Sequence, residues 1–336
     1  MTRVYLHVGP VKTGSTFLQK LLWLNRENLA EQGYLLPHDH PNDMWFAAND
    51  LQSCAFVDFD LAEANGAWEQ LVGRATKFDG SVIVSHEILG LSTPEHIAKV
   101  VWSFGDVALE VIVMARGLVD VLPSLWQEKV KMVDPDVSWP DFVAAEQASG
   151  SPWTDASRVC EQWTPHVTAE NIHVVTVPQR PFALRALLER FADATGLDVG
   201  AWDVESVPRN ESMDALQTEL LRMVNHASAR HLDRRGQRRL NNLTLLPRLG
   251  RPDPQRRLRV PLSMRPWIEE ESNRRVNWLQ TSGVSIHGDL QDLMPGPENL
   301  DAQGQDAVTD SELLREAVEL LASLPPAEDA AGRDFV

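Results

Sequence analysis

The sequence predicts an α/β fold with a central parallel sheet flanked by helices, followed by a helical C-terminal part. Three observations predict it. Short apolar segments of strand length alternate with helical patterns from residue 1 to about residue 196, which is typical of parallel sheets with helices on both faces. Beyond that point helical patterns dominate. The chain of 336 residues is 43% hydrophobic and 24% charged, which is the composition of a globular protein with a large core.

Each strand is predicted from a short apolar stretch. The predicted strands are residues 3–8, 34–36, 81–85, 107–115 and 171–177, with a last short strand and turn in 283–293. In sheets of this kind, ligands bind beyond the carboxyl ends of the strands. We therefore expect three features to lie at that edge: the loop after the first strand, His86-Glu87 after the third and Arg116 after the fourth.

Helices are predicted where apolar residues recur every three to four positions. Before residue 200 they are residues 16–32, 43–53, 60–78, a helix capped by Thr93, 118–133, 141–148, 155–165 and 182–195. Gly33 and Gly196 are expected to end two of them, and Pro123 is expected to kink or restart a third. Later helices are predicted over 213–230, 263–282 and 311–324.

The predicted organisation is one large domain with an appended tail. Residues 1–212 form the core, and residues 213–296 form a helical C-terminal part of the same domain. Within it, residues 231–261 are rich in Arg and Pro without a clear period, which favours a flexible loop or a lid. Residues 297–336 are a linker, a terminal helix and a disordered tail.

Charge and cysteine content exclude several classes of protein. A net charge of −17 argues against nonspecific nucleic-acid binding, although the arginine clusters in 234–239 and 248–259 form either a solvated surface or a local site for an anion. No apolar run is long enough for a membrane span, and no signal peptide is expected. The only two cysteines, Cys54 and Cys160, fit a cytoplasmic location and provide neither a disulfide framework nor a zinc site.

The first motif that carries chemistry is G-P-V-K-T-G-S-T-F-L-Q at residues 9–19, directly after the first strand. A glycine-bounded loop that runs into a helix points backbone N–H groups and the positive end of the helix at an anion. Lys12 and three hydroxyls would add donors, but Lys12 precedes Gly14, whereas the lysine of an ATP-binding loop follows the second glycine. The alternative is an ordinary strand-to-helix turn.

The second motif pairs Arg116, at the end of the fourth strand, with Ser124 on the following helix. A guanidinium fork and a hydroxyl can clamp one phosphate. Taken alone, an arginine at a strand end is more often part of a surface ion pair.

Together, G-x-x-K-T-G-S-T and R-x(7)-S resemble the sulfotransferase family, whose members use 3′-phosphoadenosine 5′-phosphosulfate (PAPS). The resemblance covers about residues 3–212, and residues 84–87 and 125–131 are similar to a bacterial, actinomycete-type branch. It implies a three-layer P-loop-type fold. It assigns the 5′-phosphosulfate to Lys12, Thr13, Gly14, Ser15 and Thr16, and the 3′-phosphate to Arg116 and Ser124.

The chain departs from the family pattern at a few positions. Val11 stands where a proline is usual, and Gly117 stands where an acid is common. Neither change removes a charged contact, so PAPS binding is expected to survive. The late glycine-rich cofactor loop of the family is not evident, and residues 209–212 occupy a comparable place before a helix.

The third motif, His86-Glu87, is the candidate general base, because sulfuryl transfer needs a group that takes the acceptor proton. The family uses a histidine in some branches and a glutamate in others. Neighbouring residues of a strand point in opposite directions, so we expect one of the two to face the site, with His86 slightly favoured. Both could instead be structural.

Other residues are weaker candidates for the acceptor side. His38 and His40 follow the second strand, where they line the acceptor pocket, supply the base or belong to a plain loop. Aromatic walls for an acceptor could come from Trp45, Trp126 and Trp139.

The sequence thus predicts a sulfotransferase in which an acceptor hydroxyl or amine attacks PAPS in line, Lys12 stabilises the departing phosphate oxygen, and His86 or Glu87 takes the proton. No metal is expected to be required. The acceptor is a small molecule, a carbohydrate or a lipid, and the oligomeric state stays open. Two alternatives remain: a nucleotide-dependent kinase or hydrolase on a P-loop fold, and a degenerate sulfotransferase-like binding module.

Overall fold

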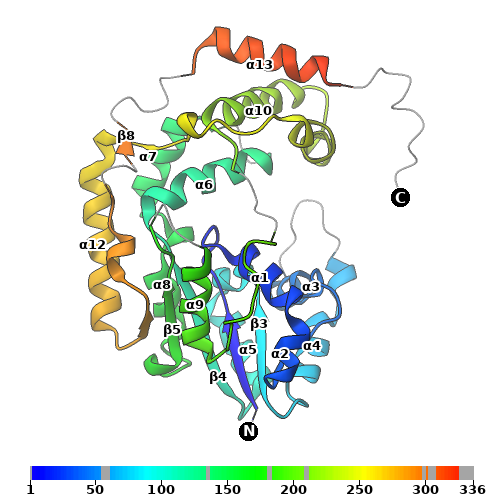
Figure 1. The fold of residues 1–336 in the computed structure, drawn as a ribbon, viewed down its shortest axis with the longest axis vertical. Coiled ribbons are helices and arrows are strands. Elements are labelled where there is room, and N and C mark those ends of the chain that lie inside the picture. The colour runs from blue at the N-terminus through cyan, green and yellow to red at the C-terminus, as the bar shows by residue number, and fades with distance from the viewer. Residues whose placement is uncertain are drawn as a thin grey trace. The chain divides into compact units, whose positions relative to one another are not determined.

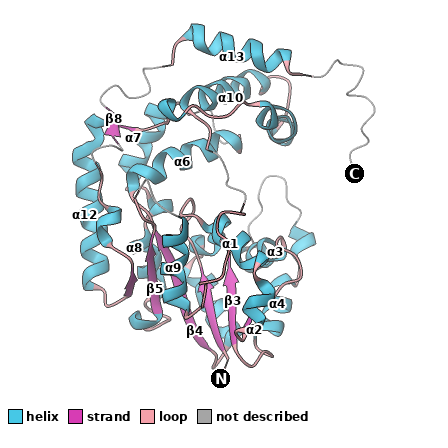
Figure 2. Cartoon of the chain, viewed as in Figure 1, coloured by secondary structure: helices cyan, strands magenta, loops and turns pink. Residues whose placement is uncertain are grey.

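Six strands form one sheet in the computed structural model, which describes residues 2–53, 61–133, 137–179, 184–207, 212–296, 300–301 and 308–324. The order in the sheet is β2-β3-β1-β4-β5-β7, and every neighbouring pair is parallel. Figure 2 shows the strands in magenta with helices around them. Their bounds are β1 Arg3–His7, β2 Tyr34–Leu35, β3 Ser81–Ser85, β4 Ala108–Ala115, β5 Ile172–Thr176 and β7 Ser285–His287. The predicted α/β fold with a parallel sheet is confirmed.

Helices cover both faces of this sheet, so its strands are apolar on both sides. Valines and leucines of the strands, such as Val4 and Leu6, face one layer, whereas Tyr5 and Ile112 face the other. The first layer contains α3 Asp43–Gln52, α4 Ala67–Ala75, α5 Pro94–Phe104, α8 Ala156–Trp163 and α12 Arg265–Thr281. The second contains α1 Ser15–Leu24, α2 Arg26–Glu31 and α9 Leu184–Thr195 (Figure 1).

The strand order changes direction beside β1. The chain leaves β1 through α1 and α2 to reach β2, which lies two places away, and β3 then fills the gap between them. The next strand, β4, lies on the other side of β1. In open α/β sheets, ligands bind at such a switch, outside the carboxyl ends of the strands. The fold therefore directs attention to the loops after β1, β3 and β4.

The chain divides into two compact units, and neither is continuous in sequence. The first comprises Met1–Val121, Glu146–Arg209 and Met264–Asn299, and the second Leu122–Ala145, Asn210–Ser263 and Leu300–Val336. The division differs from the boundaries expected from the sequence, since residues 122–145 join the second unit and residues 264–299 join the first unit, which contains the sheet. Sequence position alone did not show this, because β7 pairs with β5 across more than a hundred residues.

The second unit is mainly helical. It holds most of α6 Leu118–Lys131 and α7 Trp139–Ser149, together with α10 Ala215–Ser228, α11 Arg234–Leu240, α13 Asp310–Ala322 and a short pair of strands, β6 Val260–Pro261 and β8 Leu300–Asp301. The tail expected after α13 lies outside the described residues.

The arginine-rich segment 231–261 contains ordered secondary structure that its sequence did not predict. Asp233 caps α11, and a π-helical turn follows at Asn241–Leu245. Buried amides hold it in place: Gln237 Nε2 donates to Asn225 O at 2.6 Å, and Asn241 Nδ2 donates to Asn225 Oδ1 at 2.9 Å. The expectation of a flexible loop was wrong for residues 234–245, because amide hydrogen bonds rather than an apolar stripe fix the helix there. The alternative expectation of a lid stays a prediction.

Other differences concern helix ends. The helix predicted over 16–32 breaks at Asn25, whose Nδ2 donates to Leu21 O and so competes with the backbone for that carbonyl. The helix predicted over 60–78 is a 3₁₀ turn and then α4, separated by Gly66 at φ 80°. Pro123 does not restart α6, which runs through it, and a kink at this position stays a prediction. Within the described part of the chain, no helix combines the length and apolar character needed to cross a bilayer.

Candidate functional site

The loop after β1 has an unusual backbone. Gly9, Lys12 and Gly14 all have positive φ, at 98°, 63° and 95°. Glycine adopts this region readily, but a lysine does so only when its surroundings hold it there. Arg116 provides part of that hold, since its Nη1 donates to Lys12 O at 2.8 Å. Thr13 closes the loop from within by donating its hydroxyl to Pro10 O at 2.7 Å.

This loop ends at the N-terminus of α1. Gly14 occupies the N-cap position and supplies no side-chain cap, and the first turn of the helix holds no acidic residue. Ser15 begins the helix with its hydroxyl buried, and within the described structure Ser15 Oγ has no hydrogen-bond partner. A helix N-terminus carries partial positive charge, and a buried hydroxyl without a partner is costly. Both features suit an anion held at this point.

The turn after β3 lies directly against the loop. A Cβ on Gly90 would be 2.3 Å from Val8 O, and a Cβ on Gly9 would be 2.7 Å from Glu87 O. The backbone N–H of His86 also donates to His7 O at 3.1 Å. The structure thus brings His86-Glu87 to the edge where the loop and α1 begin, as expected.

Glu87 is the better oriented of the two candidate bases. Its Oε2 accepts a hydrogen bond of 2.9 Å from Gln19 Nε2 on α1. Burial would raise the pKa of Glu87, but His86, the residue's own backbone N–H and the Gln19 amide outweigh it, so the pKa is lowered. Glu87 is therefore a carboxylate at neutral pH.

His86 is engaged differently. Its Nδ1 accepts from the backbone N–H of Ile88 at 3.3 Å and so caps the 3₁₀ turn Glu87–Leu91. Burial lowers the pKa of His86 although Glu87 opposes the shift, so the ring is neutral at pH 7. Because the imidazole is neutral, Glu87 carries the only charge of the pair.

His7 was missed by the sequence analysis. It ends β1, is fully buried, and places Nδ1 2.8 Å from Ser85 Oγ, while its ring lies edge-on to Phe191. Burial lowers its pKa to about 4, so the ring is neutral at neutral pH. The signal that could have found it is a histidine inside an otherwise apolar strand, at the carboxyl end that borders the loop.

The two residues of the predicted phosphate clamp fall in different parts of the chain. Arg116 follows β4 and reaches the loop through Lys12 O. Ser124 lies on α6, in the part of that helix assigned to the second unit. A clamp formed by both residues stays a prediction. Thr16, which was assigned to the same anion as Ser15, is exposed in the first turn of α1.

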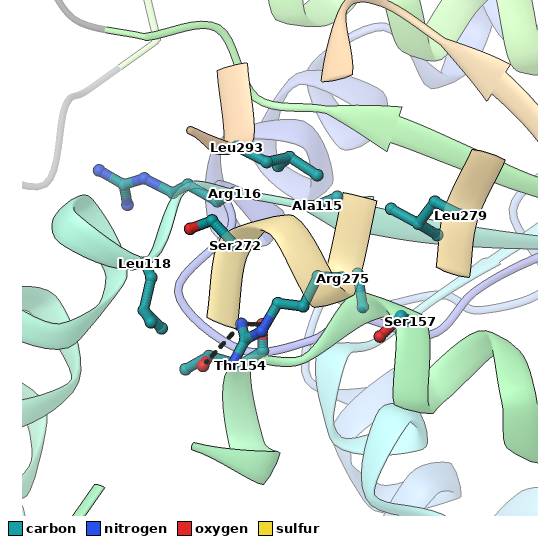
Figure 3. Close-up of a pocket in the computed structure, with 10 residues that line it drawn as sticks. Ala115, Arg116, Leu118, Thr154, Ser157, Ser272, Arg275, Leu279 and Leu293 are labelled. Carbon is teal, nitrogen blue, oxygen red and sulfur yellow. Dashed lines mark hydrogen bonds between the residues drawn. The ribbon is translucent and has the colours of Figure 1, made fainter. Parts of the chain in front are cut away.

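A small cavity lies beside the end of β4 (Figure 3). Its volume of about 10 Å³ is close to the room that one water molecule needs. Arg275 in its wall is already paired, donating to Glu271 Oε1 at 3.0 Å and to Thr154 O at 3.1 Å. Figure 3 shows the Arg116 side chain directed away from the other lining residues. The cavity is therefore part of the packing and not the ligand site.

The remaining candidates serve local structure. His38 stacks on Trp23 and bonds to His40 O, and His40 Nδ1 accepts from the N–H of Asn42. Trp45 packs partly buried against the core.

Trp126 and Trp139 are about 1% exposed and pack on each other in the second unit, with ring centroids 5.4 Å apart. As core residues they offer no wall to an acceptor, so that expectation was wrong. Of the predicted loop at 209–212, residues 209–211 lie outside the described residues.

The fold and this edge define a three-layer α/β protein whose loop and helix N-terminus can hold an anion beside a half-buried carboxylate. Among the described residues, no group of three or more side chains is arranged to hold a metal ion. Comparison with protein-family models, curated proteins and solved structures finds no match to the chain.

Replacing Gly90 with alanine tests the close approach of the two backbones. Gly90→Ala is expected to destabilise the protein by about 1–3 kcal/mol, because the new methyl group would meet the Val8 carbonyl and not a movable side chain. The measurement is urea unfolding. The matched control is Gly73→Ala inside α4, where nothing lies within 4 Å and a gain of about 0.5–1 kcal/mol is expected. Equal stability of the two variants would contradict the close approach.

His7 makes stability depend on pH. Its pKa in the folded protein is about 4 and lies below the value of about 6.5 expected when unfolded, so the unfolded chain takes up the proton first as the pH falls. The contribution of His7 to the free energy of unfolding is fully present above about pH 6.5 and is lost as the pH falls towards 4. Between pH 7 and pH 5 the wild type should lose about 2 kcal/mol more than His7→Asn. Urea unfolding at both pH values measures this, with exposed His40→Asn as control; parallel losses in all three proteins would refute it.

Proposed function

We propose that this protein is a sulfotransferase that moves a sulfuryl group from PAPS to a hydroxyl or amine acceptor. The observation that carries the proposal is the contact between the loop after β1 and the turn that bears Glu87. It puts groups suited to a departing phosphate next to a group suited to take a proton. The resemblance of the loop and of R-x(7)-S to sulfotransferase motifs supports the same reaction.

In this proposal the loop and α1 bind the 5′ side of the donor. Lys12 supplies the full positive charge for the phosphate oxygen that becomes the leaving group. Ser15 Oγ, buried and without a described partner, fits a contact with an anionic oxygen. The acceptor oxygen forms a bond to sulfur while the bond from sulfur to the phosphate oxygen breaks, and the charge that develops there falls at Lys12 and the N-terminus of α1.

Glu87 takes the acceptor proton in this scheme. It is ionised at neutral pH and its carboxylate is fixed by Gln19, whereas Nδ1 of His86 is occupied with capping a turn. A carboxylate close to the acceptor is a suitable proton acceptor during the transfer step. His86 remains the alternative base, and the experiment below separates the two.

Arg116 and Ser124 are assigned to the 3′-phosphate by resemblance. The guanidinium donates one N–H to Lys12 O, and the planar fork of N–H donors in an arginine suits the oxygens of a phosphate. We place the reaction in the cytoplasm, a choice supported by the low cysteine content and by Cys160, a buried thiol whose pKa burial raises. The acceptor would be a small molecule, a carbohydrate or a lipid.

Calorimetric titration with adenosine 3′,5′-bisphosphate tests the donor site. Lys12→Ala and Arg116→Ala should each lower its affinity at least tenfold, because each removes a charge-assisted hydrogen bond to phosphate. Exposed Lys77→Ala is the control. Tight binding of ATP with magnesium, without binding of the bisphosphate, would instead indicate a kinase or hydrolase.

A second ligand separates the two roles available to Arg116. Adenosine 5′-monophosphate lacks the 3′-phosphate, so Arg116→Ala should leave its affinity nearly unchanged if the guanidinium binds that group. Equal losses for both nucleotides would mean that Arg116 acts only by holding Lys12 O.

The base is tested by transfer from PAPS, followed as release of the bisphosphate with a panel of acceptors. Glu87→Gln should lower the rate by at least about a hundredfold while retaining bisphosphate affinity, as expected for loss of a general base. His86→Asn should lower the rate less than about tenfold, since asparagine can also cap this turn. The reverse order would make His86 the base, and unchanged rates in both variants would exclude this pair.

A further inference from the structure

Gln19 links the helix that follows the loop after β1 to Glu87, the candidate base. It belongs to α1, and its Nε2 donates to Glu87 Oε2 at 2.9 Å and lies 3.4 Å from Ser85 O. One side chain therefore contacts both the last residue of β3 and the carboxylate two positions later. No role was assigned to it from the sequence, although it closes the motif at residues 9–19.

The helix fixes the distance between the two parts of the site. Ser15 and Gln19 are four positions apart in α1 and so lie on the same face, with a rise of about 6 Å between them. Ser15 is at the anion end of this turn, and Gln19 holds the carboxylate at the other. A helical turn is stiff compared with a loop, so the separation between anion and carboxylate is set by backbone geometry.

An amide is the suitable side chain for this task. It donates to one carboxylate oxygen and carries no charge, so it orients Glu87 without forming an ion pair that would hold the proton-accepting form more strongly. Among the described residues, the titratable groups that shift the pKa of Glu87 by their charge are His86 and His7, and burial keeps both rings neutral at neutral pH. The orientation of the carboxylate thus depends mainly on Gln19 and on the residue's own backbone N–H.

We propose that Gln19 is a positioning residue that holds the Glu87 carboxylate at a fixed distance from the anion site at the N-terminus of α1. The proposal rests on the proposed function, because Glu87 must act as the base for the position to matter in catalysis. Gln19 itself touches neither the donor nor the acceptor in this scheme.

Gln19→Met removes the donor at similar side-chain length. The expected result is a fall in kcat of about tenfold with little change in KM for PAPS or in bisphosphate affinity. Because the Gln19 N–H stabilises the carboxylate, its loss should raise the pKa of Glu87 and move the acidic limb of the kcat profile up by about 1 pH unit. Gln32→Met is the matched control, since that amide donates to Asn28 Oδ1 at 2.7 Å away from the site.

A double variant and a direct titration complete the test. In a Glu87→Gln background, adding Gln19→Met should cost less than about threefold, since there is no base left to position. Carbon-13 NMR of the Glu87 carboxyl should show the same upward shift of its titration in Gln19→Met, whether or not the protein transfers sulfuryl groups.

The outcomes distinguish failure of the two ideas. A wild type that binds no bisphosphate overturns the proposed function, and an unchanged Glu87 titration in Gln19→Met overturns the positioning role. If kcat and bisphosphate affinity fall together while the acidic limb stays in place, Gln19 only ties α1 to β3 through Ser85 O, and the proposal is wrong.

Discussion

The candidate site depends on the close backbone approach between the loop after β1 and the turn after β3. Gly9 lies against the Glu87 carbonyl, and Gly90 lies against the Val8 carbonyl. Both approaches are possible only because glycine has no side chain. The parallel pairing of β1 with β3 determines this contact, because its register places the last residues of both strands side by side at one edge of the sheet. The position of Glu87 relative to Lys12 is thus fixed by the sheet register and by two glycines.

Electrostatic separation follows from this packing. Positive charge collects on one side of the contact, from Lys12 and the N-terminus of α1, and negative charge lies on the other, at Glu87. His7, at the end of β1, is buried and neutral, so it fills space and bonds to Ser85 Oγ without adding a charge. A carboxylate that can take a proton and a site suited to an anion can therefore lie at the same edge of the sheet.

The strands, their parallel arrangement and the edge that holds the site were predictable, because buried strands and glycine-bounded turns leave a strong local signal. The contact between Gln19 and Glu87 was not, since it joins residues 68 positions apart and depends on how α1 packs against β3. A last short strand was predicted within residues 283–293, where β7 lies, but its pairing with β5 was not predicted because that pairing is not local. The helix α11 was not predicted because buried amides, and not an apolar stripe, hold it in place.

Arg116 links the strand that ends beside the loop to the loop itself. By donating to Lys12 O, it supports a backbone conformation that a lysine adopts only under constraint. Under the proposed function the same guanidinium also meets the 3′-phosphate. One side chain would then be coupled to both ends of the donor, because a shift of Arg116 towards the 3′-phosphate would alter its hydrogen bond to Lys12 O. Binding at the 3′ end would in this way adjust the lysine that stabilises the leaving group at the 5′ end.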